Sequence, residues 1–460
     1  MMELNTDIET LAKTVTGRVI RGAVKAPFNS FETDTRKLKS GEFFWAFKGA
    51  AHDAHVFLEE TLEKNVKGWI VEDHKIGRFT AYPEFVIGVW DTLKALHRLA
   101  AWHRNRFPIP VAAITGSNGK STTKEMLKSI FEHVGPACSN LGNLNNQFGL
   151  PLSLLELQSA HKFGVFELGA SKKGDVFEIG TLAKPTAAVI TNIGPAHLEY
   201  FGDLETVFRT KTEIIDCLAP GGTLVYNADD KYLEVLKARK MNKIGFGWCG
   251  GADLKIGDRA GALELRFKDK TVIVNLPGKV RYNYLNAAAA AGAALAAGLD
   301  LAAVKAGLEA FTPPPMRMQT LKIKDAVIIL DAYNANPASM RAALETFFNS
   351  GDFPKPWYLA LGDMKELGKY SAAYHAELGR YLAGLGAEKI FLAGPEMKAA
   401  ADELLKTGPA PGGTHAAEVA YDSDPAAWTG ELRALITGQK GSFLIKASRA
   451  MQFERLIEGL

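Results

Sequence analysis

A glycine-rich segment at 115–122, TGSNGKST, lies between a short apolar run and an amphipathic stretch. Glycines let backbone N–H groups close around phosphate oxygens, and the first turn of a following helix adds positive potential. The Lys120 ammonium can reach the terminal phosphates of a nucleotide, and the Ser121 hydroxyl can bind Mg²⁺. Only two residues separate the glycines, fewer than in the common phosphate loop, so a plain glycine turn with a chance lysine is the alternative. The predicted phosphate-loop residues are Thr115, Gly116, Ser117, Asn118, Gly119, Lys120, Ser121 and Thr122.

Two more polar side chains follow apolar runs further along the chain. Glu167 ends the run at 163–168, and His197 comes after the run at 186–192. Ligands of parallel α/β sheets bind beyond the carboxyl ends of the strands, so we expect both side chains beside the phosphate loop. A carboxylate and an imidazole there suit a Mg²⁺ ion that bridges phosphate and substrate. The alternatives are a helix-capping carboxylate for Glu167 and an ordinary loop hydrogen bond for His197.

Lys211 lies on the apolar face of a predicted helix at 204–218. Apolar residues recur along that face in steps of four and three, and Lys211 stands at its centre. A buried ammonium there would have a lowered pKa and, once neutral, could react with CO₂ to give an anionic, metal-binding carbamate. The alternative, which periodicity alone favours, is a lysine whose stem covers apolar surface while its head reaches water. The apolar positions of this face are Leu204, Phe208, Ile215 and Leu218.

The elements that must position these residues are predicted from short apolar runs that alternate with helical patterns. In the middle of the chain the predicted strands are 111–115, 163–168, 186–192 and 223–227, and a helix is predicted from Ser121 to Val134. Continuous apolar strands separated by helices indicate a parallel sheet with both faces covered. The last third repeats this pattern at 326–330, 357–362, 389–394 and 442–447, which predicts a second, Rossmann-like sheet.

Prolines divide the chain into three predicted domains. One group is FPIP at 107–110, and the other is Pro313 to Pro315, after a helical run from Asn286 to Phe311. Stacked prolines favour stiff, extended connectors. The sequence therefore predicts an α/β protein with an α/β N-terminal domain at 1–108, a central P-loop-type domain with a mainly parallel sheet at 109–312, and a Rossmann-like C-terminal domain at 313–460.

Composition excludes several other classes of protein. The net charge of the 460 residues is only +3, too small to indicate a nucleic-acid surface. The three cysteines, Cys138, Cys217 and Cys249, form no CxxC pair, which favours a reducing compartment over disulfides or a thiolate metal site. No apolar run approaches the roughly 20 residues of a bilayer span, and the first residues lack a signal-peptide core. We therefore expect a cytoplasmic protein, not inserted in a membrane, that acts on small soluble molecules.

The phosphate loop, Glu167, His197 and Lys211 together resemble the central domain of the Mur ligases, which build the peptide of peptidoglycan. Folylpolyglutamate synthetases share that architecture. The resemblance implies that Lys211 is carbamylated and that two Mg²⁺ ions are bound. The implied metal ligands are Ser121, Glu167, His197 and the modified Lys211, and the implied catalytic residues are Lys120, His197, Lys211 and Arg317.

Motifs in the other two domains narrow the resemblance. DAYNANPASMR at 331–341 and LGDMKELG at 361–368 closely resemble signatures of the Mur ligase that adds D-alanyl-D-alanine to UDP-N-acetylmuramoyl-tripeptide. The last domain lacks the Asp-Asn-Pro-Arg motif typical of the member that adds the third residue. DTR at 34–36, GEFFWAFKG at 41–49 and DAH at 53–55 resemble the region that holds the UDP-sugar end. The resemblance spans essentially the whole chain.

Further roles follow from the resemblance residue by residue. Asn283 is implied to lie near adenine, Arg317 to reach the ATP phosphates across a domain cleft, and Asp331 and Asn334 to contact the nucleotide. From the residues alone, a turn-forming aspartate after a strand is the favoured interpretation of Asp331. Alanine replaces both glycines of the family's Lys-Gly-Ser-Arg-Gly loop at 446–450. The implied substrate-binding residues are Asp34, Arg36, Phe47, Lys48, Gly49, Asp53, His55, Asn143, Asn145, Asn146, Lys446, Ser448 and Arg449.

The resemblance implies an ATP-dependent ligase that activates a carboxylate as an acyl phosphate and joins it to an amine. The implied partners are UDP-N-acetylmuramoyl-tripeptide and D-alanyl-D-alanine, and we expect a monomer. A ligase that adds diaminopimelate or lysine, or a folylpolyglutamate synthetase, is an alternative with the same chemistry. A P-loop regulatory NTPase that hydrolyses ATP without ligation is an alternative of another class.

Overall fold

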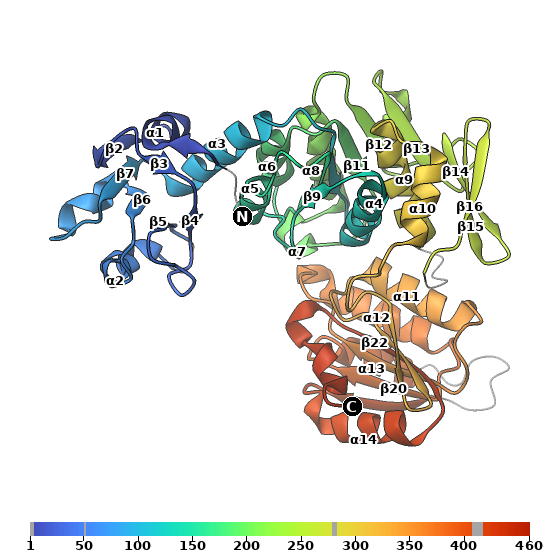
Figure 1. Ribbon diagram of the computed structural model, residues 1–460. Coiled ribbons are helices and arrows are strands. Elements are labelled where there is room, and N and C mark those ends of the chain that lie inside the picture. The colour runs from blue at the N-terminus through green and yellow to red at the C-terminus, as the bar shows by residue number, and fades with distance from the viewer. Residues whose placement is uncertain (1–3, 50–51, 278–282, 407–416) are drawn as a thin grey trace.

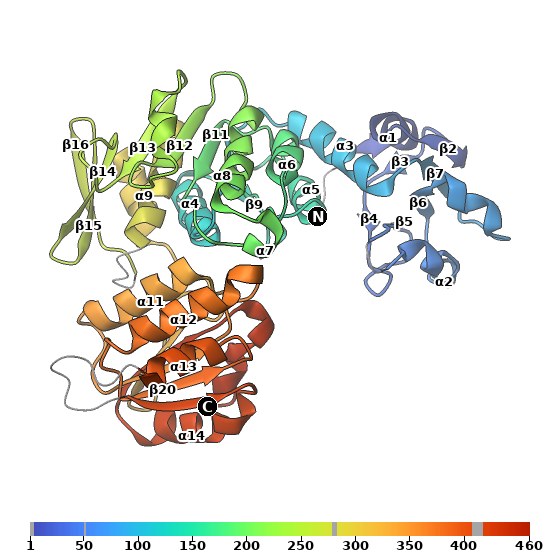
Figure 2. The same cartoon turned by 180° about the vertical axis from the view of Figure 1, so that it is seen from behind.

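The computed structural model describes residues 4–49, 52–277, 283–406 and 417–460. These residues form three bodies, each built around an α/β sheet (Figures 1 and 2). The N-terminal body joins the side of the central one through helix α3 (Thr92–Asn105), and the C-terminal body lies below the central one in the views of Figures 1 and 2. This arrangement confirms the predicted three-part α/β fold. No helix among the described residues has the length and apolarity to cross a membrane.

The N-terminal body contains a five-stranded sheet in the order β2-β7-β6-β5-β4. Strands β4 to β7 are parallel, and β2 pairs antiparallel with β7. The strands are β2 (Arg18–Arg21), β4 (Phe31–Glu32), β5 (Phe43–Trp45), β6 (Gly68–Glu72) and β7 (Phe85–Val89). Helices α1 (Ile8–Val15) and α2 (Leu58–Glu63) and a short ladder of β1 (Thr6–Asp7) and β3 (Pro27–Phe28) complete this body.

The central sheet has the order β16-β15-β14-β13-β12-β11-β8-β10-β9. Strands β8 to β14 pair in parallel, whereas β14, β15 and β16 form an antiparallel extension that periodicity did not predict. The strands are β8 (Val111–Thr115), β9 (Ala137–Ser139), β10 (Phe163–Glu167), β11 (Ala187–Ile190), β12 (Thr223–Asn227), β13 (Lys243–Gly247), β14 (Leu254–Arg259), β15 (Ala262–Phe267) and β16 (Lys270–Val274). The helices are α4 (Lys120–Val134), α5 (Gly149–Leu154), α6 (Asp175–Ala183), α7 (Leu198–Phe201), α8 (Leu204–Thr212), α9 (Asn283–Ala296) and α10 (Leu301–Glu309).

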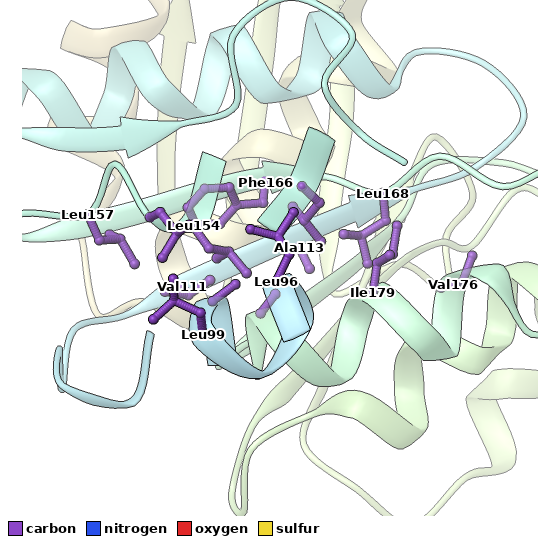
Figure 3. Close-up of a cluster of buried hydrophobic side chains, with 14 of the residues drawn as sticks. Leu96, Leu99, Val111, Ala113, Leu154, Leu157, Phe166, Leu168, Val176 and Ile179 are labelled. Carbon is purple, nitrogen blue, oxygen red and sulfur yellow. The ribbon is translucent and has the colours of Figure 1, made fainter. Parts of the chain in front are cut away.

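Apolar residues on both faces of the central sheet are buried, as the continuous apolar strands predict. Alternate residues of β8 enter different cores because successive side chains of a strand point to opposite faces. Val111 and Ala113 join the core that includes α3, α5 and α6, and Figure 3 shows them beside Leu96 and Leu99 of α3. Ala112 and Ile114 join the core formed by α4, α9 and α10. Helix α3 thus packs on the central sheet as well as on the N-terminal body.

The C-terminal sheet has the order β17-β18-β22-β19-β20-β21 and is parallel except for β17. Its strands are β17 (Gln319–Ile323), β18 (Ala326–Leu330), β19 (Trp357–Gly362), β20 (Lys389–Ala393), β21 (Glu418–Asp422) and β22 (Gly441–Lys446). Helices α11 (Pro337–Asn349), α12 (Ser371–Leu382) and α13 (Lys398–Lys406) contribute to the core of one face, and α14 (Ala426–Gly438) to that of the other. This body has the predicted Rossmann-like pattern.

Two predicted helices are shorter in the structure. The helix predicted at 204–218 ends at Thr212, and a 3₁₀ helix continues over Glu213–Cys217. The Glu213 carboxylate there accepts hydrogen bonds from the backbone of Gly174 and Phe177, a tertiary contact that apolar periodicity does not encode. The helical run predicted from Asn286 to Phe311 is two helices, because Gly298 adopts a φ of +88° and ends α9.

Candidate active site

The phosphate loop lies between β8 and α4, where its spacing predicted it. Gly116 has a φ of +141° and Gly119 a φ of +82°, conformations that favour glycine. A Cβ atom on Gly119 would lie 2.1 Å from Oδ1 of Asn286, and one on Gly116 would lie 2.0 Å from Oγ1 of Thr191. Both glycines are therefore favoured by backbone conformation and by close packing.

Lys120 begins α4 and turns back over the loop. Its ammonium donates to the carbonyl oxygens of Gly116 at 2.9 Å and Ser117 at 3.3 Å. Burial lowers the pKa of Lys120, although the nearby Glu167 carboxylate acts in the opposite direction. The Lys120 ammonium thus lies over the loop with only neutral carbonyl oxygens as hydrogen-bond partners.

Glu167 lies at the carboxyl end of β10 and faces the loop. One carboxylate oxygen accepts a 2.6 Å hydrogen bond from the Ser121 hydroxyl, and the other accepts one of 2.8 Å from the Asn145 amide. Its backbone is held by buried Asn140, whose side chain accepts from the Glu167 N–H and donates to its carbonyl oxygen. Asn140 was not among the predicted site residues. Its closeness in sequence to Asn143, Asn145 and Asn146 was the only feature that could have indicated its role.

His197 follows β11 in a left-handed conformation, with φ +56° and ψ +32°, at the start of α7. Its Nδ1 lies 2.5 Å from a carboxylate oxygen of Glu366 in the C-terminal body. This pairing lowers the pKa of Glu366. The imidazole is thus near the phosphate loop, as predicted, but one ring nitrogen contacts the other body.

Lys211 is buried, with a relative exposure of 1%, so the interpretation of a solvent-reaching lysine is wrong. Its ammonium lies 5.6 Å from the centre of the Phe201 ring and has no hydrogen-bond or ion-pair partner among the described residues. Burial, with a further contribution from the charge of Lys120, lowers the pKa of Lys211 to about 7. Such an amine is partly neutral near physiological pH and can act as a nucleophile.

Residues of the C-terminal body approach the loop from across the domain boundary. The Arg317 guanidinium donates to the Ser121 hydroxyl at 2.9 Å and lies over the Tyr333 ring at 4.1 Å. The side-chain amide of Asn336 donates to Asn118 of the phosphate loop at 2.6 Å. Arg317 was predicted, whereas Asn336 and Tyr333 were not, although both lie in the motif at 331–341.

Buried Lys446 holds two predicted nucleotide contacts together. Its ammonium donates to the Asp331 carboxylate at 2.6 Å and to the backbone carbonyl of Asn334 at 3.0 Å. Ser448 is buried and donates to the carbonyl oxygen of Ala335. Lys446 and Ser448 therefore order the loop after β18, beside the implied nucleotide.

These elements enclose a cavity of about 570 Å³ between the central and C-terminal bodies. Fifteen of the predicted residues line it: Ser117, Asn118, Gly119, Lys120, Ser121, Thr122, Asn143, Asn145, Asn146, Glu167, His197, Arg317, Asp331, Asn334 and Lys446. Lining residues missed by the prediction include Asn192, Asn286, Tyr333, Asn336, Lys365 and Glu366. Four of these, Tyr333, Asn336, Lys365 and Glu366, lie inside the motifs at 331–341 and 361–368, so those motifs were the signal that could have indicated them.

Several predicted residues of the central and C-terminal bodies lie outside this lining. Thr115 and Gly116, the first residues of the loop, do not line the cavity, and buried Asn283 accepts a hydrogen bond from Asn286, which does line it. Arg449 points elsewhere and pairs with Glu454 at 2.6 Å. Lys211 and Ser448 are also outside the lining.

The predicted residues of the N-terminal body form no part of the cavity. Asp53, His55 and Lys75 form a local polar cluster in which Lys75 contacts the Asp53 carboxylate at 2.8 Å and the His55 Nδ1 atom is 2.7 Å from the other Asp53 oxygen. Exposed Arg36 pairs with Asp34 and lowers the pKa of that carboxyl to about 2. The exposed residues Lys48 and Gly49 follow Phe47, whose ring contacts Phe148 of the central body edge-on at 4.9 Å.

The residues around the loop fit a magnesium ion that is held mainly by phosphate. Within the described residues, no three His, Cys, Asp or Glu side chains converge as a ready-made metal cluster. Mg²⁺ usually binds through one or two protein oxygens plus substrate phosphates. The adjacent Ser121 hydroxyl and Glu167 carboxylate, both facing the cavity, supply such oxygens.

Comparisons with known proteins agree with this geometry. Residues 114–294 match the Mur ligase middle domain, and residues 316–449 match the family described as Mur ligase, glutamate ligase domain. The UDP-N-acetylmuramoyl-tripeptide--D-alanyl-D-alanine ligase of Escherichia coli (strain K12) is 32% identical over 438 residues, which cover 93% of this chain and 92% of the relative.

Two solved structures extend the match to three dimensions. A crystal structure of MurF from Acinetobacter baumannii is 32% identical with a TM-score of 0.88, covering 99% of this chain and 98% of that one. The MurF ligase of Thermotoga maritima in complex with ADP is 29% identical with a TM-score of 0.79, covering 93% of this chain and 96% of that one. The phosphate loop, its partner residues and these near full-length matches lead to one conclusion: the chain belongs to the Mur ligase family.

Proposed function

We propose that this protein is an ATP-dependent ligase that adds D-alanyl-D-alanine to UDP-N-acetylmuramoyl-tripeptide with release of ADP and phosphate. The observation that carries the proposal is the cavity in which the phosphate loop, Glu167, His197 and Arg317 meet. The relative from Escherichia coli named for this reaction matches 93% of the chain, and the relative from Thermotoga maritima binds ADP in a similar fold. The cavity and the two relatives together support the proposal that this ligase reaction takes place in the cavity.

In this proposal the triphosphate lies along the loop at 115–122. The backbone N–H groups of the loop and the start of α4 bind phosphate oxygens, and Lys120 leaves its carbonyl partners for the terminal phosphates. The substrate carboxylate attacks the γ-phosphorus in line, and an acyl phosphate and ADP result. Arg317 and Lys120 stabilise the charge that develops on the transferred group.

Mg²⁺ bound at Ser121 and Glu167, with His197 beside it, would neutralise phosphate charge and orient the transferred group. The family resemblance implies two such ions. The Ser121 hydroxyl and the Glu167 carboxylate lie within hydrogen-bond distance of each other, which supports a binding site there for the first of these ions. Asn145 holds the second carboxylate oxygen and so fixes the direction of Glu167.

We propose that Lys211 carries a carbamate formed with CO₂. Its burial, its pKa of about 7 and the absence of a hydrogen-bond or ion-pair partner among the described residues all support this modification. A carbamate would convert a buried cation, whose burial cost the charges of nearby Glu167, Asp175 and Glu213 only partly offset, into an anion that can bind a metal ion. The Lys211 ammonium lies 5.6 Å from the centre of the Phe201 ring in α7, the short helix that begins after His197, which supports a metal-binding group near that histidine.

The second step joins the amine to the activated carbonyl. The free amino group of D-alanyl-D-alanine attacks the acyl carbon, and the tetrahedral intermediate loses phosphate. We assign the UDP-sugar end to the N-terminal body, through the segments around Asp34, Phe47 and Asp53, and the incoming dipeptide to the C-terminal body. Holding both substrates between bodies lowers the entropic cost of the encounter. This reaction belongs to peptidoglycan precursor synthesis in the cytoplasm, and we propose that a monomer carries it out.

A coupled phosphate-release assay tests the proposal. The purified protein is given ATP, Mg²⁺ and a UDP-N-acetylmuramoyl-tripeptide whose third residue is diaminopimelate or lysine, with a panel of amine acceptors. We expect release that depends on D-alanyl-D-alanine and a product heavier by that dipeptide in mass spectrometry. Release with single amino acids instead would indicate another Mur ligase or a folylpolyglutamate synthetase. ATP turnover that is indifferent to both substrates would indicate a regulatory NTPase.

A further inference from the structure

The C-terminal body reaches His197 through the loop after β19. The carboxylate of Glu366 contacts His197. The backbone carbonyl oxygen of Glu366 also accepts a 3.0 Å hydrogen bond from the Glu199 N–H. Further along, the Tyr370 hydroxyl donates to the carbonyl oxygen of Gly202 at 3.1 Å. These contacts hold both ends of the short helix α7 that His197 begins.

The backbone on both sides of this contact is held in an uncommon conformation. Glu366 has a φ of +64° and His197 a φ of +56°, values that non-glycine residues adopt only at a steric cost. A Cβ atom on Gly368, whose φ is +53°, would lie 3.0 Å from Cα of Glu199. The surrounding structure therefore determines where the carboxylate and the imidazole meet.

The loop that carries Glu366 is anchored rigidly to its own body. The fully buried Asp363 accepts hydrogen bonds from the Met397 N–H and the Lys365 ammonium. The next backbone N–H, of Met364, donates to Nε2 of buried His375. These contacts tie the residues directly before Glu366 to the C-terminal body.

The contact selects one form of the imidazole. A neutral histidine whose Nδ1–H donates to a carboxylate presents Nε2 as its acceptor, and a carboxylate partner of this kind fixes ring orientation. Nε2 of His197 has no hydrogen-bond partner among the described residues, and the side chain lines the cavity with Ser121 and Glu167. The nitrogen left for a ligand is thus the one opposite Glu366.

We propose that Glu366 is a positioning residue that fixes the tautomer and orientation of His197, and that it does so only while the C-terminal body is docked on α7. The inference rests on the proposed function, because it assumes that His197 serves the metal and phosphate site. When the C-terminal body docks, it brings Arg317 to the loop and Glu366 to His197. In this proposal the same movement therefore positions both Arg317 and His197 at the phosphates.

The first experiment measures the imidazole directly, without substrates. The protein is labelled with ¹⁵N-histidine and studied by NMR. The chain has ten histidines, and the signals that disappear in the His197→Gln variant are assigned to His197. We expect a single Nδ1–H tautomer in the unaltered chain, mixed tautomers in Glu366→Ala, and recovery in Glu366→Gln, whose amide oxygen can accept the same hydrogen bond. Tyr370→Phe removes a docking contact away from the ring and should leave the signals unchanged. Unaltered His197 signals in Glu366→Ala would overturn the proposal.

The second experiment separates positioning from docking by magnesium dependence. Glu366→Ala should raise the Mg²⁺ concentration for half-maximal phosphate release by about tenfold or more, whereas Tyr370→Phe should change it less than about twofold. Equal effects in both variants, or an unchanged Mg²⁺ requirement in Glu366→Ala, would contradict the proposed role. If the unaltered chain shows no acceptor-dependent phosphate release, the proposed function fails, while the tautomer measurement still decides the role of Glu366.

Discussion

The hydroxyl of Ser121 accepts a 2.9 Å hydrogen bond from the guanidinium of Arg317, a residue 196 positions further along the chain. The same hydroxyl donates to Glu167 at 2.6 Å. The central and C-terminal bodies therefore meet at the oxygen that we propose as a magnesium ligand. In the proposed mechanism, phosphate binding and the relative position of the two bodies depend on the same atoms, so residues far from the loop should affect the chemistry.

Removal of the loop ammonium should abolish phosphoryl transfer. We expect Lys120→Ala to lower kcat for phosphate release at least 100-fold, because a cation positioned at the developing charge contributes about 3 kcal/mol or more in a desolvated site. Lys128→Ala is the matched control, since Lys128 lies on the same helix and pairs with Glu132 on its surface. Near-normal turnover in Lys120→Ala would show that the loop at 115–122 is not the phosphate site.

A methyl group at Gly119 should close the loop to nucleotide. Gly119→Ala places a Cβ 2.1 Å from Asn286 at a φ of +82°, so the loop or the first turn of α9 must shift. We expect the KM for ATP to rise at least tenfold. Gly221→Ala is the control, because Gly221 has a similar φ of +77° but open space around it. Its kinetic constants should stay within about twofold, at a stability cost near 1 kcal/mol. Equal KM values in the two variants would contradict the packing argument.

Carbamylation of Lys211 should be visible and should depend on pH. Only the neutral amine reacts with CO₂, and burial lowers the pKa of Lys211 to about 7. In ¹³C-bicarbonate buffer we expect a carbamate signal in ¹³C NMR that grows as the pH rises through about 7. Lys211→Arg should lose it, and Lys128→Arg should keep it. A spectrum at about pH 8 without a signal that depends on Lys211 would contradict the modification.

The same residue makes a prediction for stability in buffer freed of CO₂. Below about pH 7, Lys211 is protonated in both the folded and the unfolded chain, so the cost of burying its charge is fully present. Between pH 7 and the ordinary value of 10.5, the unfolded chain holds a proton that the folded chain has released, so the free energy of unfolding rises with pH. Lys211→Met should be more stable than the unaltered chain by a few kcal/mol at about pH 6, and this gain should shrink towards about pH 10. Denaturant titrations at the two pH values measure it; a gain independent of pH would contradict the buried charge.

The buried pair of Lys446 and Asp331 should be important for stability. Lys446→Met leaves the Asp331 carboxylate without its 2.6 Å partner, and stranding one member of a buried pair costs about 3–5 kcal/mol. The double variant with Asp331→Asn should recover part of that loss. Lys398→Met, which breaks an exposed pair with Asp402, should cost less than about 1 kcal/mol. Thermal unfolding measures all three, and a Lys446→Met variant as stable as Lys398→Met would contradict the prediction.

Local pattern predicted most of the elements that carry the site. The predicted strands at 111–115, 223–227 and 326–330 have the observed bounds. Strands of a parallel sheet are buried on both faces, so their sequences are nearly continuous apolar runs that end where the strand ends. The antiparallel strands β14 to β16 were missed, since their half-exposed residues give no continuous run. The helix predicted at 204–218 was too long, because tertiary contacts of Glu213 select a 3₁₀ turn there.

By itself the sequence determined the phosphate loop, the strand ends that hold Glu167 and His197, and the family motifs, because each depends on residues close together in the chain. Only the tertiary structure decided that Lys211 is buried without a partner, that Asn140 supports Glu167, and that Glu366 contacts His197. Burial and pairing of this kind depend on which segments meet after folding. For Glu366 and His197 the two segments are 169 residues apart and belong to different bodies, so periodicity within either one contains no information about their contact.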